Sequence, residues 1–190
     1  MLQYNYVDVA LVHHPVVNKR GETIGSAITN LDLHDIARAC RTYGVNNYWV
    51  ITPFAEQQKF AETIVSHWVQ GYGSKANPDR GSALTLIKVC SDLERVIDSM
   101  REKWGEDPLI LTTCAKPQTN FMDYGEAKQR IKNGGKVLLV FGTAWGLAPE
   151  VLDRADAVLP PIYGTGDYNH LSVRSAVAII LDRLLGSFTG

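Results

Sequence analysis

The segment at residues 142–146, GTAWG, follows a run of five apolar residues, VLLVF, and precedes a helical stretch. Glycine has no Cβ, so Gly142 and Gly146 let backbone amides and carbonyls approach a ligand closely. In α/β proteins, a glycine-bearing loop between a buried strand and a helix is a common entrance to a small-molecule pocket. Neither common phosphate-binding glycine fingerprint is present, so we expect a ligand that is not held by its phosphates. A tight strand-to-helix turn without a ligand is the alternative interpretation.

The loop at residues 159–172, LPPIYGTGDYNHLS, carries a second group of reactive side chains. It contains two prolines, two glycines and two tyrosines, together with Asp167, Asn169 and His170. Prolines stiffen the chain and glycines permit unusual turns, which is a costly combination for a simple connection between a strand and a helix. We therefore interpret this segment as a binding loop.

Two further loops carry polar side chains. The first, residues 13–30, begins with His13 and His14. Adjacent residues of an extended strand point to opposite sides, and no cysteine or carboxylate cluster accompanies these histidines, so we expect no metal site. The second loop, TTCAKPQTN at residues 112–120, offers hydroxyl groups and Lys116 and is uninformative by itself.

Local signatures of several enzyme classes are missing. The sequence has no nucleophile elbow, no G-x-x-x-x-G-K-[ST] loop, no H-E-x-x-H, no C-x-x-C and no G-x-G-x-x-G after the first predicted strand. These absences argue against a hydrolase, an NTPase, a zincin, a thioredoxin-like protein and an NAD-dependent dehydrogenase.

An α/β fold must position these loops. Apolar, β-rich runs alternate with segments of helical periodicity, which predicts a mostly parallel six-stranded sheet with helices on both faces. The predicted strands cover residues 7–12, 47–51, 84–90, 108–114, 136–141 and 155–160.

Helices are predicted from periodicity and from signals at their ends. The helices at residues 32–44 and 173–185 each have an apolar face, and the second face is a continuous stripe that predicts packing on the sheet or, alternatively, a dimer surface. Residues 71–83, with three glycines and a proline, predict a mobile binding loop. Helix starts are predicted at Thr52 with Pro53, at Ser91 with Glu94 and at Asp123 with Glu126. The glycine pair in residues 133–135 predicts the end of the helix that begins near Asp123.

The composition is that of an ordinary globular protein. The 190 residues carry a formal net charge of −1 and 45% hydrophobic residues, which predicts a single domain over residues 1–190. The N-terminus lacks the features of a secretion signal and no apolar run is long enough to span a membrane, so we expect a cytoplasmic protein that does not enter membranes. The near-zero charge gives no global signature of nucleic-acid binding, so an RNA partner would meet a local basic patch or a second subunit.

Three segments together resemble the sequence motifs of the SPOUT superfamily of S-adenosylmethionine (SAM)-dependent RNA methyltransferases. The segments are NLDLHDIARACRTYGVNNYWVITP, KVLLVFGTAWGLAPE and YNHLSVRSAVAIILDRL, at residues 30–53, 136–150 and 168–184. The resemblance implies an α/β fold with a C-terminal trefoil knot, which is rare among protein folds. It also implies that SAM binds in the knot, that the substrate is an RNA, either tRNA or rRNA, and that a homodimer partner completes the active site.

The resemblance also directs attention to particular site residues. Methyl transfer from a sulfonium requires alignment of the reacting groups and removal of any proton on the acceptor. Candidate proton acceptors are Asp32, Asp167 and His170. The groups that would hold phosphate or polarise the acceptor are Arg38, Arg41 and Arg174. The implied SAM-binding residues are Thr112, Thr113, Phe141, Gly142, Thr143, Ala144, Trp145, Gly146, Pro160, Ile162, Tyr163, Gly164, Asn169, Leu171, Ser172 and Ala176.

Departures from the SpoU-like ribose methyltransferases leave the methylated atom open. Those enzymes have an Asn six residues before the Arg of their first motif, where this chain has Asp32 before Arg38. Their third motif has Asn and Ser where this chain has Ser172 and Arg174. The target is therefore either a base or a ribose. Two alternatives remain: a non-catalytic RNA-binding or ligand-binding dimer on the same scaffold, and an unrelated nucleotide-binding enzyme.

Overall fold

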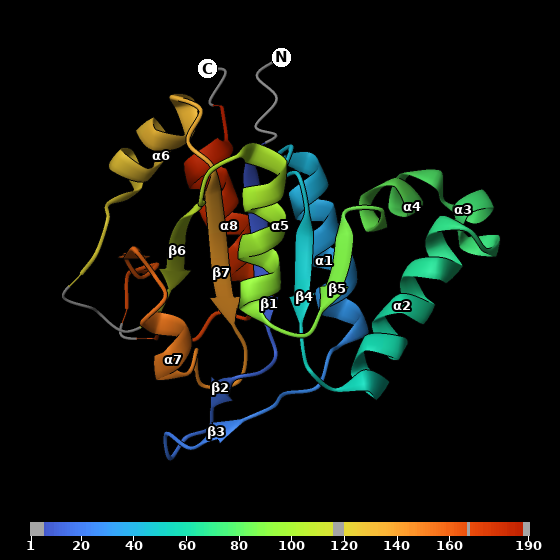
Figure 1. Ribbon diagram of the computed structural model, residues 1–190, viewed down its shortest axis with the longest axis horizontal. Helices are drawn as coiled ribbons and strands as arrows, with labels where there is room; N and C mark the ends of the chain where they lie inside the picture. The colour runs from blue at the N-terminus through green and yellow to red at the C-terminus, as the bar shows by residue number, and fades with distance from the viewer. Residues whose placement is uncertain (1–5, 116–119, 167, 188–190) are drawn as a thin grey trace.

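The computed structural model describes residues 6–115, 120–166 and 168–187, which form a central sheet with helices on both faces (Figure 1). The six predicted strands are all present, so the prediction of the sheet is confirmed. Their bounds are β1 Val7–Val12, β4 Tyr48–Ile51, β5 Ile87–Cys90, β6 Leu109–Thr113, β7 Val137–Gly142 and β8 Ala157–Leu159.

The strand order is β5-β4-β1-β7-β6-β8, and every pair of neighbours is parallel. Because parallel strands share a direction, their carboxyl ends lie at one edge of the sheet, where loops can form a ligand site. Here β6 pairs with β7 on one side and β8 on the other, so the loops that follow these three strands begin side by side.

Alternate side chains of the strands enter two separate cores. Val9 and Leu11 belong to the core on one face, whereas Ala10 and Val12 belong to the core on the other. The first face is covered by α1 (Asn30–Thr42), α6 (Tyr124–Lys132) and α8 (Val173–Leu185), and the second by α5 (Leu93–Trp104) and α7 (Pro149–Leu152). Burial on both faces explains why the central strands are almost continuously apolar.

Helix α8 buries the apolar stripe seen in the sequence. Val177, Ile180, Leu181, Leu184 and Leu185 are all buried in the first core. The helix packs against α1, α6 and β7. The stripe is therefore used mainly for packing within this chain.

Two predicted helix starts need correction. Helix α2 begins at Ala55, beyond the Thr52–Pro53 dipeptide that predicted its start. The cap of α5 is Asp92 and not Ser91, because the Asp92 carboxylate accepts the amide of Arg95. Asp123, by contrast, caps α6 as predicted and accepts the amide of Glu126.

The prediction of a mobile loop at residues 71–83 was wrong. This segment forms two short helices, α3 (Tyr72–Ala76) and α4 (Pro78–Leu84), which join α2 (Ala55–Val69) in a helical lobe beside β5 (Figure 1). Asn77 caps α4 by accepting the amide of Arg80, and Pro78 occupies the first turn, where proline is tolerated. The lobe contains Gly73 and Gly81, and a Cβ on either would lie 2.7 Å from an atom of Trp68. These glycines therefore serve close helix packing.

A short hairpin in the early loop was not predicted. Strands β2 (Val16–Val17) and β3 (Thr23–Ile24) pair antiparallel and lie below the sheet in Figure 1. Two-residue strands are too short to show alternation, which is why the sequence pattern missed them.

Candidate functional site

The loops after β6 and β8 contact each other at the carboxyl edge of the sheet. The side-chain amide of Asn169 donates to the carbonyl of Ala115 at 2.8 Å, and the hydroxyl of Tyr124 donates to the carbonyl of Pro160 at 2.9 Å. The structure thus brings two of the predicted binding loops together. Asp167 and Lys116 lie outside the described residues.

The GTAWG segment forms a tight turn that is tied to the early hairpin. The amide of Trp145 donates to the carbonyl of Val17 at 3.0 Å, and the amide of Val17 donates to the carbonyl of Gly146 at 2.9 Å. The amide of Gly146 is in turn bonded to the carbonyl of Thr143. Two of the amides that the sequence analysis assigned to a ligand are therefore already used within the protein.

The backbone of this turn is unusual at Ala144. Ala144 has φ 52°, in the left-handed region that L-residues rarely adopt, and its amide has no hydrogen-bond partner among the described residues. Strained conformations of this kind are often found at ligand sites. Trp145, next in the chain, has a 60% exposed side chain, with the ammonium of Lys19 6.0 Å from its ring centre.

Gly142 is required where β7 enters the turn. A Cβ at this position would lie 2.9 Å from the backbone nitrogen of Leu147 and 3.1 Å from the carbonyl carbon of Gly146. The first contact is shorter than real Cβ atoms make and the second is tighter than most, and backbone cannot move away as a flexible side chain can. The glycine therefore allows the turn to fold back on the end of its own strand.

A chain of hydrogen bonds runs from the turn into the early loop. The hydroxyl of Thr143 donates to the carbonyl of Val12 at 3.0 Å and is also bonded to the hydroxyl of Ser26. The hydroxyl of Ser26 also lies 3.2 Å from Nδ1 of His13 and donates to the carbonyl oxygen of His13 at 3.4 Å. The imidazole of His13 thus supports the turn through Ser26.

His13 is fully buried at the end of β1, and its Nε2 has no partner in the described part of the chain. Burial lowers the pKa of His13 to about 4, while the negative charge of Asp32 acts in the opposite direction. Desolvation disfavours the protonated imidazole, so His13 is neutral near pH 7. The early loop that contains His13 and Ser26 leads directly into α1, whose first turn carries Asp32.

Asp32 and Arg174 meet where α1 and α8 begin. Nη1 of Arg174 lies 3.7 Å from Oδ1 of Asp32, and Nε of Arg174 lies 3.5 Å from Oδ2 of Asp35. Asp32 is only 8% exposed, and its amide is bonded to the hydroxyl of Thr29, which caps α1. The guanidinium of Arg174 can hold this carboxylate in place, which makes Asp32 a candidate to accept a proton from a bound substrate.

The other predicted catalytic residues that the structure describes lie elsewhere. Arg38 faces a groove between α1 and α4 together with Arg41 and Arg80. His170 is exposed, and its ring centre lies 5.5 Å from that of Tyr168. The structure therefore joins two of the six candidates, Asp32 and Arg174, in a direct contact.

Several predicted SAM-binding residues have structural roles. Phe141 and Thr112 are buried, so their side chains belong to the interior, and the hydroxyl of Thr112 has no partner among the described residues. The hydroxyl of Ser172 accepts the amide of Ser175 and caps α8. Two residues that support the turn, His13 and Ser26, were not among the predicted site residues. The position of His13 directly after a predicted parallel strand could have indicated that it lies near the site.

Two further findings concern the described residues. Among residues 6–115, 120–166 and 168–187, no group of three or more His, Cys, Asp or Glu side chains is arranged to hold a metal ion. In the same ranges, none of the helices combines the length and the apolar character that crossing a bilayer demands.

Comparison with known proteins identifies relatives across nearly the whole chain. Residues 6–186 match the family described as SAM-dependent RNA methyltransferase. A tRNA (guanine-N(1)-)-methyltransferase of Oleidesulfovibrio alaskensis is 45% identical over 179 residues, which cover 93% of this chain and 41% of that protein. An Aquifex aeolicus protein of unassigned function is 40% identical over 179 residues, covering 94% of this chain and 87% of its own length. The chain thus spans less than half the length of its methyltransferase relative.

The fold is also that of a solved methyltransferase. The SpoU methyltransferase AviRb from Streptomyces viridochromogenes, in complex with the cofactor AdoMet, has a TM-score of 0.57 and 17% identity, with coverage of 95% of this chain and 57% of that one. At this low sequence identity, the similarity concerns the fold alone. The match of the family model to residues 6–186 confirms the family expected from the three motifs, and the chain belongs to the SAM-dependent RNA methyltransferases.

Proposed function

We propose that this chain binds SAM at the carboxyl edge of β6, β7 and β8 and transfers its methyl group to RNA. The observation that carries the proposal is the hydrogen-bonded cluster of the glycine turn, Ser26 and His13 at this edge of the sheet. The loop that contains Ser26 leads into α1, whose first turn carries the carboxylate of Asp32. The same sheet edge holds the loops after β6 and β8.

The residues at this edge fit SAM. The free amide of Ala144 is an available polar group, and the exposed rings of Trp145 and Tyr163 offer apolar surface. No phosphate-binding glycine fingerprint is needed, because SAM has no phosphate. Bound here, SAM would supply an electrophilic methyl group on a sulfonium centre.

The protein's part in the reaction is alignment and proton removal. We assign the proton acceptor to Asp32, because its carboxylate is nearly buried and is held by Arg174 at 3.7 Å. Guanine N1 and a ribose hydroxyl each carry a proton, so methylation of either atom requires a group that accepts this proton. His170 and Asp167 remain alternatives for this role. Arg38 would contact substrate phosphate or the acceptor nucleotide.

The RNA to test first is tRNA, with rRNA second. A relative that is 45% identical is named a tRNA (guanine-N(1)-)-methyltransferase. That protein is more than twice as long as the part matched here, so its printed activity describes a larger molecule. We therefore propose tRNA as the substrate class and leave the methylated atom to experiment.

We also propose the C-terminal trefoil knot. Strand β8 is at the edge of the sheet, whereas the helix that follows it packs against α1, α6 and β7. The connecting chain therefore crosses back over the sheet, and Asn169 within it is bonded to Ala115 of the loop after β6. A crystal structure with the C-terminal segment passing outside that loop would contradict the knot.

A homodimer is the proposed assembly, with residues 1–190 as one cytoplasmic domain. Leu31 in the first turn of α1 is 58% exposed, and Leu171 just before α8 is 47% exposed. These apolar side chains flank two helices that pack against each other, and a second copy would cover them. Sedimentation equilibrium tests this directly, because a monomer at micromolar concentration would contradict the assembly.

The central experiment combines calorimetry with methyl transfer. Titration of the purified protein with SAM should give micromolar binding, and incubation with labelled SAM should methylate bulk tRNA or rRNA. Nucleoside analysis of the product then separates N1-methylguanosine from other methylated bases and from 2′-O-methylribose. Absence of binding at millimolar SAM would overturn the proposal. Binding without transfer to either RNA would favour the non-catalytic alternative.

A further inference from the structure

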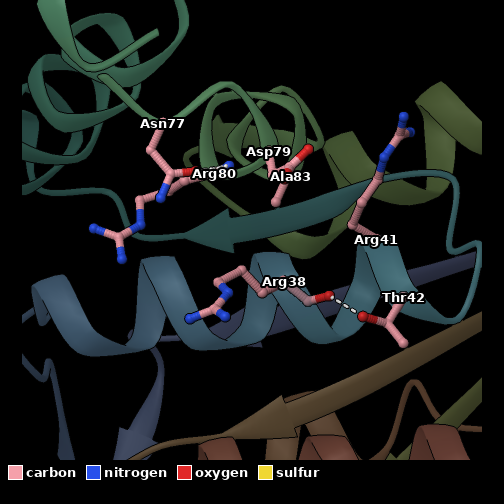
Figure 2. A pocket seen from close by; sticks show the side chains of 7 residues that line it. All are labelled: Arg38, Arg41, Thr42, Asn77, Asp79, Arg80 and Ala83. Atoms are coloured by element: carbon pink, nitrogen blue, oxygen red, sulfur yellow. Dashed lines mark hydrogen bonds between the residues drawn. The ribbon is translucent and has the colours of Figure 1, made fainter. Parts of the chain in front are cut away.

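A groove between α1 and α4 gathers three arginines. Arg38 and Arg41 come from α1, and Arg80 comes from the first turn of α4 (Figure 2). The groove has a volume of about 340 Å³ and contains a single carboxylate, that of Asp79. It lies beside the helical lobe of residues 55–84 and not in the loops assigned to SAM.

The charge of these arginines is not neutralised within the described chain. Arg38, Arg41 and Arg80 form no ion pair there, whereas other exposed arginines such as Arg101 and Arg154 each contact a carboxylate. Three guanidinium groups against one carboxylate make the groove locally positive, although the whole chain has a net charge of −1. This is the kind of local basic patch that a nearly neutral protein needs for an RNA partner.

Arg80 is held in place before any ligand arrives. Its guanidinium carbon lies 4.7 Å from the centre of the Trp68 ring. The ring centre of His34 lies 5.4 Å from that of Trp68. The pKa of His34 is lowered, first by burial and then by the positive charge of Arg80. Gly73 packs closely against the ring of Trp68, and Gly81 packs against its backbone carbonyl. A fixed arginine loses less entropy on binding than a free one.

The arginines point to different parts of the groove. In Figure 2, the guanidinium groups of Arg38 and Arg80 extend toward one end, while that of Arg41 extends toward the other. One small anion would need these groups to converge. A ligand with a repeated negative charge matches guanidinium groups that are spread along a groove.

We propose that the groove between α1 and α4 binds the phosphodiester backbone of the RNA substrate, with Arg41 and Arg80 contacting separate phosphates. This inference rests on the proposed function and adds the helical lobe to the substrate-binding surface. Contacts to phosphate position an RNA without reading its sequence. Guanidinium groups suit this task because they donate two parallel hydrogen bonds to phosphate oxygens.

The test measures RNA binding as a function of salt. The variant Arg41→Ala/Arg80→Ala should bind bulk tRNA and single-stranded oligouridylate at least about tenfold more weakly than wild type near physiological salt. The slope of log affinity against log salt concentration should be smaller in magnitude by about 1.5. Its affinity for SAM should equal that of wild type. Arg41→Lys/Arg80→Lys keeps both charges and should recover most of the slope but only part of the affinity.

A matched control uses two arginines on the opposite face of the sheet. Arg95 and Arg101 of α5 are exposed, and Arg95→Ala/Arg101→Ala removes the same charge, so this variant should bind RNA like wild type. Equal loss in both double variants would overturn the inference, as would unchanged RNA binding in Arg41→Ala/Arg80→Ala.

The outcomes also separate this inference from the proposed function. If wild type methylates RNA while Arg41→Ala/Arg80→Ala retains full RNA affinity, the groove assignment fails and the function stands. If wild type binds SAM but no RNA at low salt, both fail. Sedimentation completes the test, because loss of RNA binding together with dissociation of the assembly would make the groove a subunit contact and overturn the inference.

Discussion

The guanidinium of Arg174, in the first turn of α8, lies 3.7 Å from the carboxylate of Asp32, in the first turn of α1. The same guanidinium also contacts Asp35, at 3.5 Å. The two carboxylates differ in environment, because the side chain of Asp32 is 11% exposed and that of Asp35 is 52% exposed. The negative charge of Asp32 also acts to raise the pKa of His13, against the larger effect of burial.

This difference predicts separate effects of two similar substitutions. Asp32→Asn removes the proposed proton acceptor with little change in shape, so methyl transfer should fall about 100-fold or more. Binding of SAM should be unchanged, because alignment of the donor depends on the loops. Single-turnover transfer of labelled methyl groups and calorimetry with SAM measure the two quantities.

The matched control for this prediction is Asp35→Asn. It removes the other carboxylate that contacts Arg174 but leaves the nearly buried one, so transfer should stay within about threefold of wild type. Equal losses in the two variants would mean that the carboxylates only orient Arg174. The assignment of Asp32 as a proton acceptor would then be wrong.

The sheet could be predicted from the sequence because its strands have a simple physical signal. Strand β7 is buried on both faces and appears as an unbroken apolar run, and β1 is apolar except for Asp8. The cap at Asp123 and the apolar stripe of α8 were predicted for similar local reasons. Elements with weaker local signals were missed. The hairpin of β2 and β3 is too short to show periodicity, and it is fixed by bonds to the distant turn at Trp145 and Gly146.

The glycines of residues 71–83 illustrate a different failure. Their density suggested a mobile loop, but a Cβ on Gly73 or Gly81 would lie 2.7 Å from an atom of Trp68. Whether a glycine serves motion or close packing depends on what lies opposite it, and the local sequence does not contain that information. The contact between Asp32 and Arg174 was hidden for the same reason, because it arises from the packing of α1 against α8.

Loss of the hydroxyl of Ser26 should weaken SAM binding. Ser26 joins Thr143 of the glycine turn to His13, so Ser26→Ala leaves both groups without this partner. A hydrogen bond of this type contributes about 1 kcal/mol, which corresponds to an increase in the Kd for SAM of about fivefold. Thr63→Ala is the control, because the hydroxyl of Thr63 is exposed and bonds only to Lys59 within its own helix. Identical SAM affinities in the two variants would show that the turn is formed without Ser26.

A methyl group at residue 142 should destabilise the fold. Gly142→Ala places a Cβ 2.9 Å from the backbone nitrogen of Leu147, and the resulting shift of the turn should lower the free energy of unfolding by about 1–3 kcal/mol. Gly166→Ala is the control, since no heavy atom lies within 4 Å of a Cβ at that position. Urea denaturation measures both. Equal stability of the two variants would contradict the close approach at Gly142.

The burial of His13 predicts how stability depends on pH. The pKa of His13 is about 4 in the folded protein because of burial, against 6.5 in the unfolded chain. Between these values the unfolded state binds a proton that the folded state does not, so stability falls as the pH falls from 6.5 to 4. The full effect of this one group is on the order of 3 kcal/mol. Above pH 6.5 neither state binds the proton, and the contribution no longer changes.

Substitution of His13 separates its contribution to the pH dependence of stability from the contribution of the carboxylates, which also titrate in acid. His13→Asn removes the imidazole. The free energy of unfolding of this variant should therefore fall less between pH 6.5 and 4 than that of wild type, whatever the stability of the variant at pH 7. His67→Asn, on the exposed surface of α2, controls for the loss of an imidazole. In wild type, the NMR signals of the His13 ring should titrate only near pH 4. Parallel stability curves, or titration of His13 near pH 6.5, would mean that the imidazole is hydrated, and the supporting contact to Ser26 would then be absent in solution.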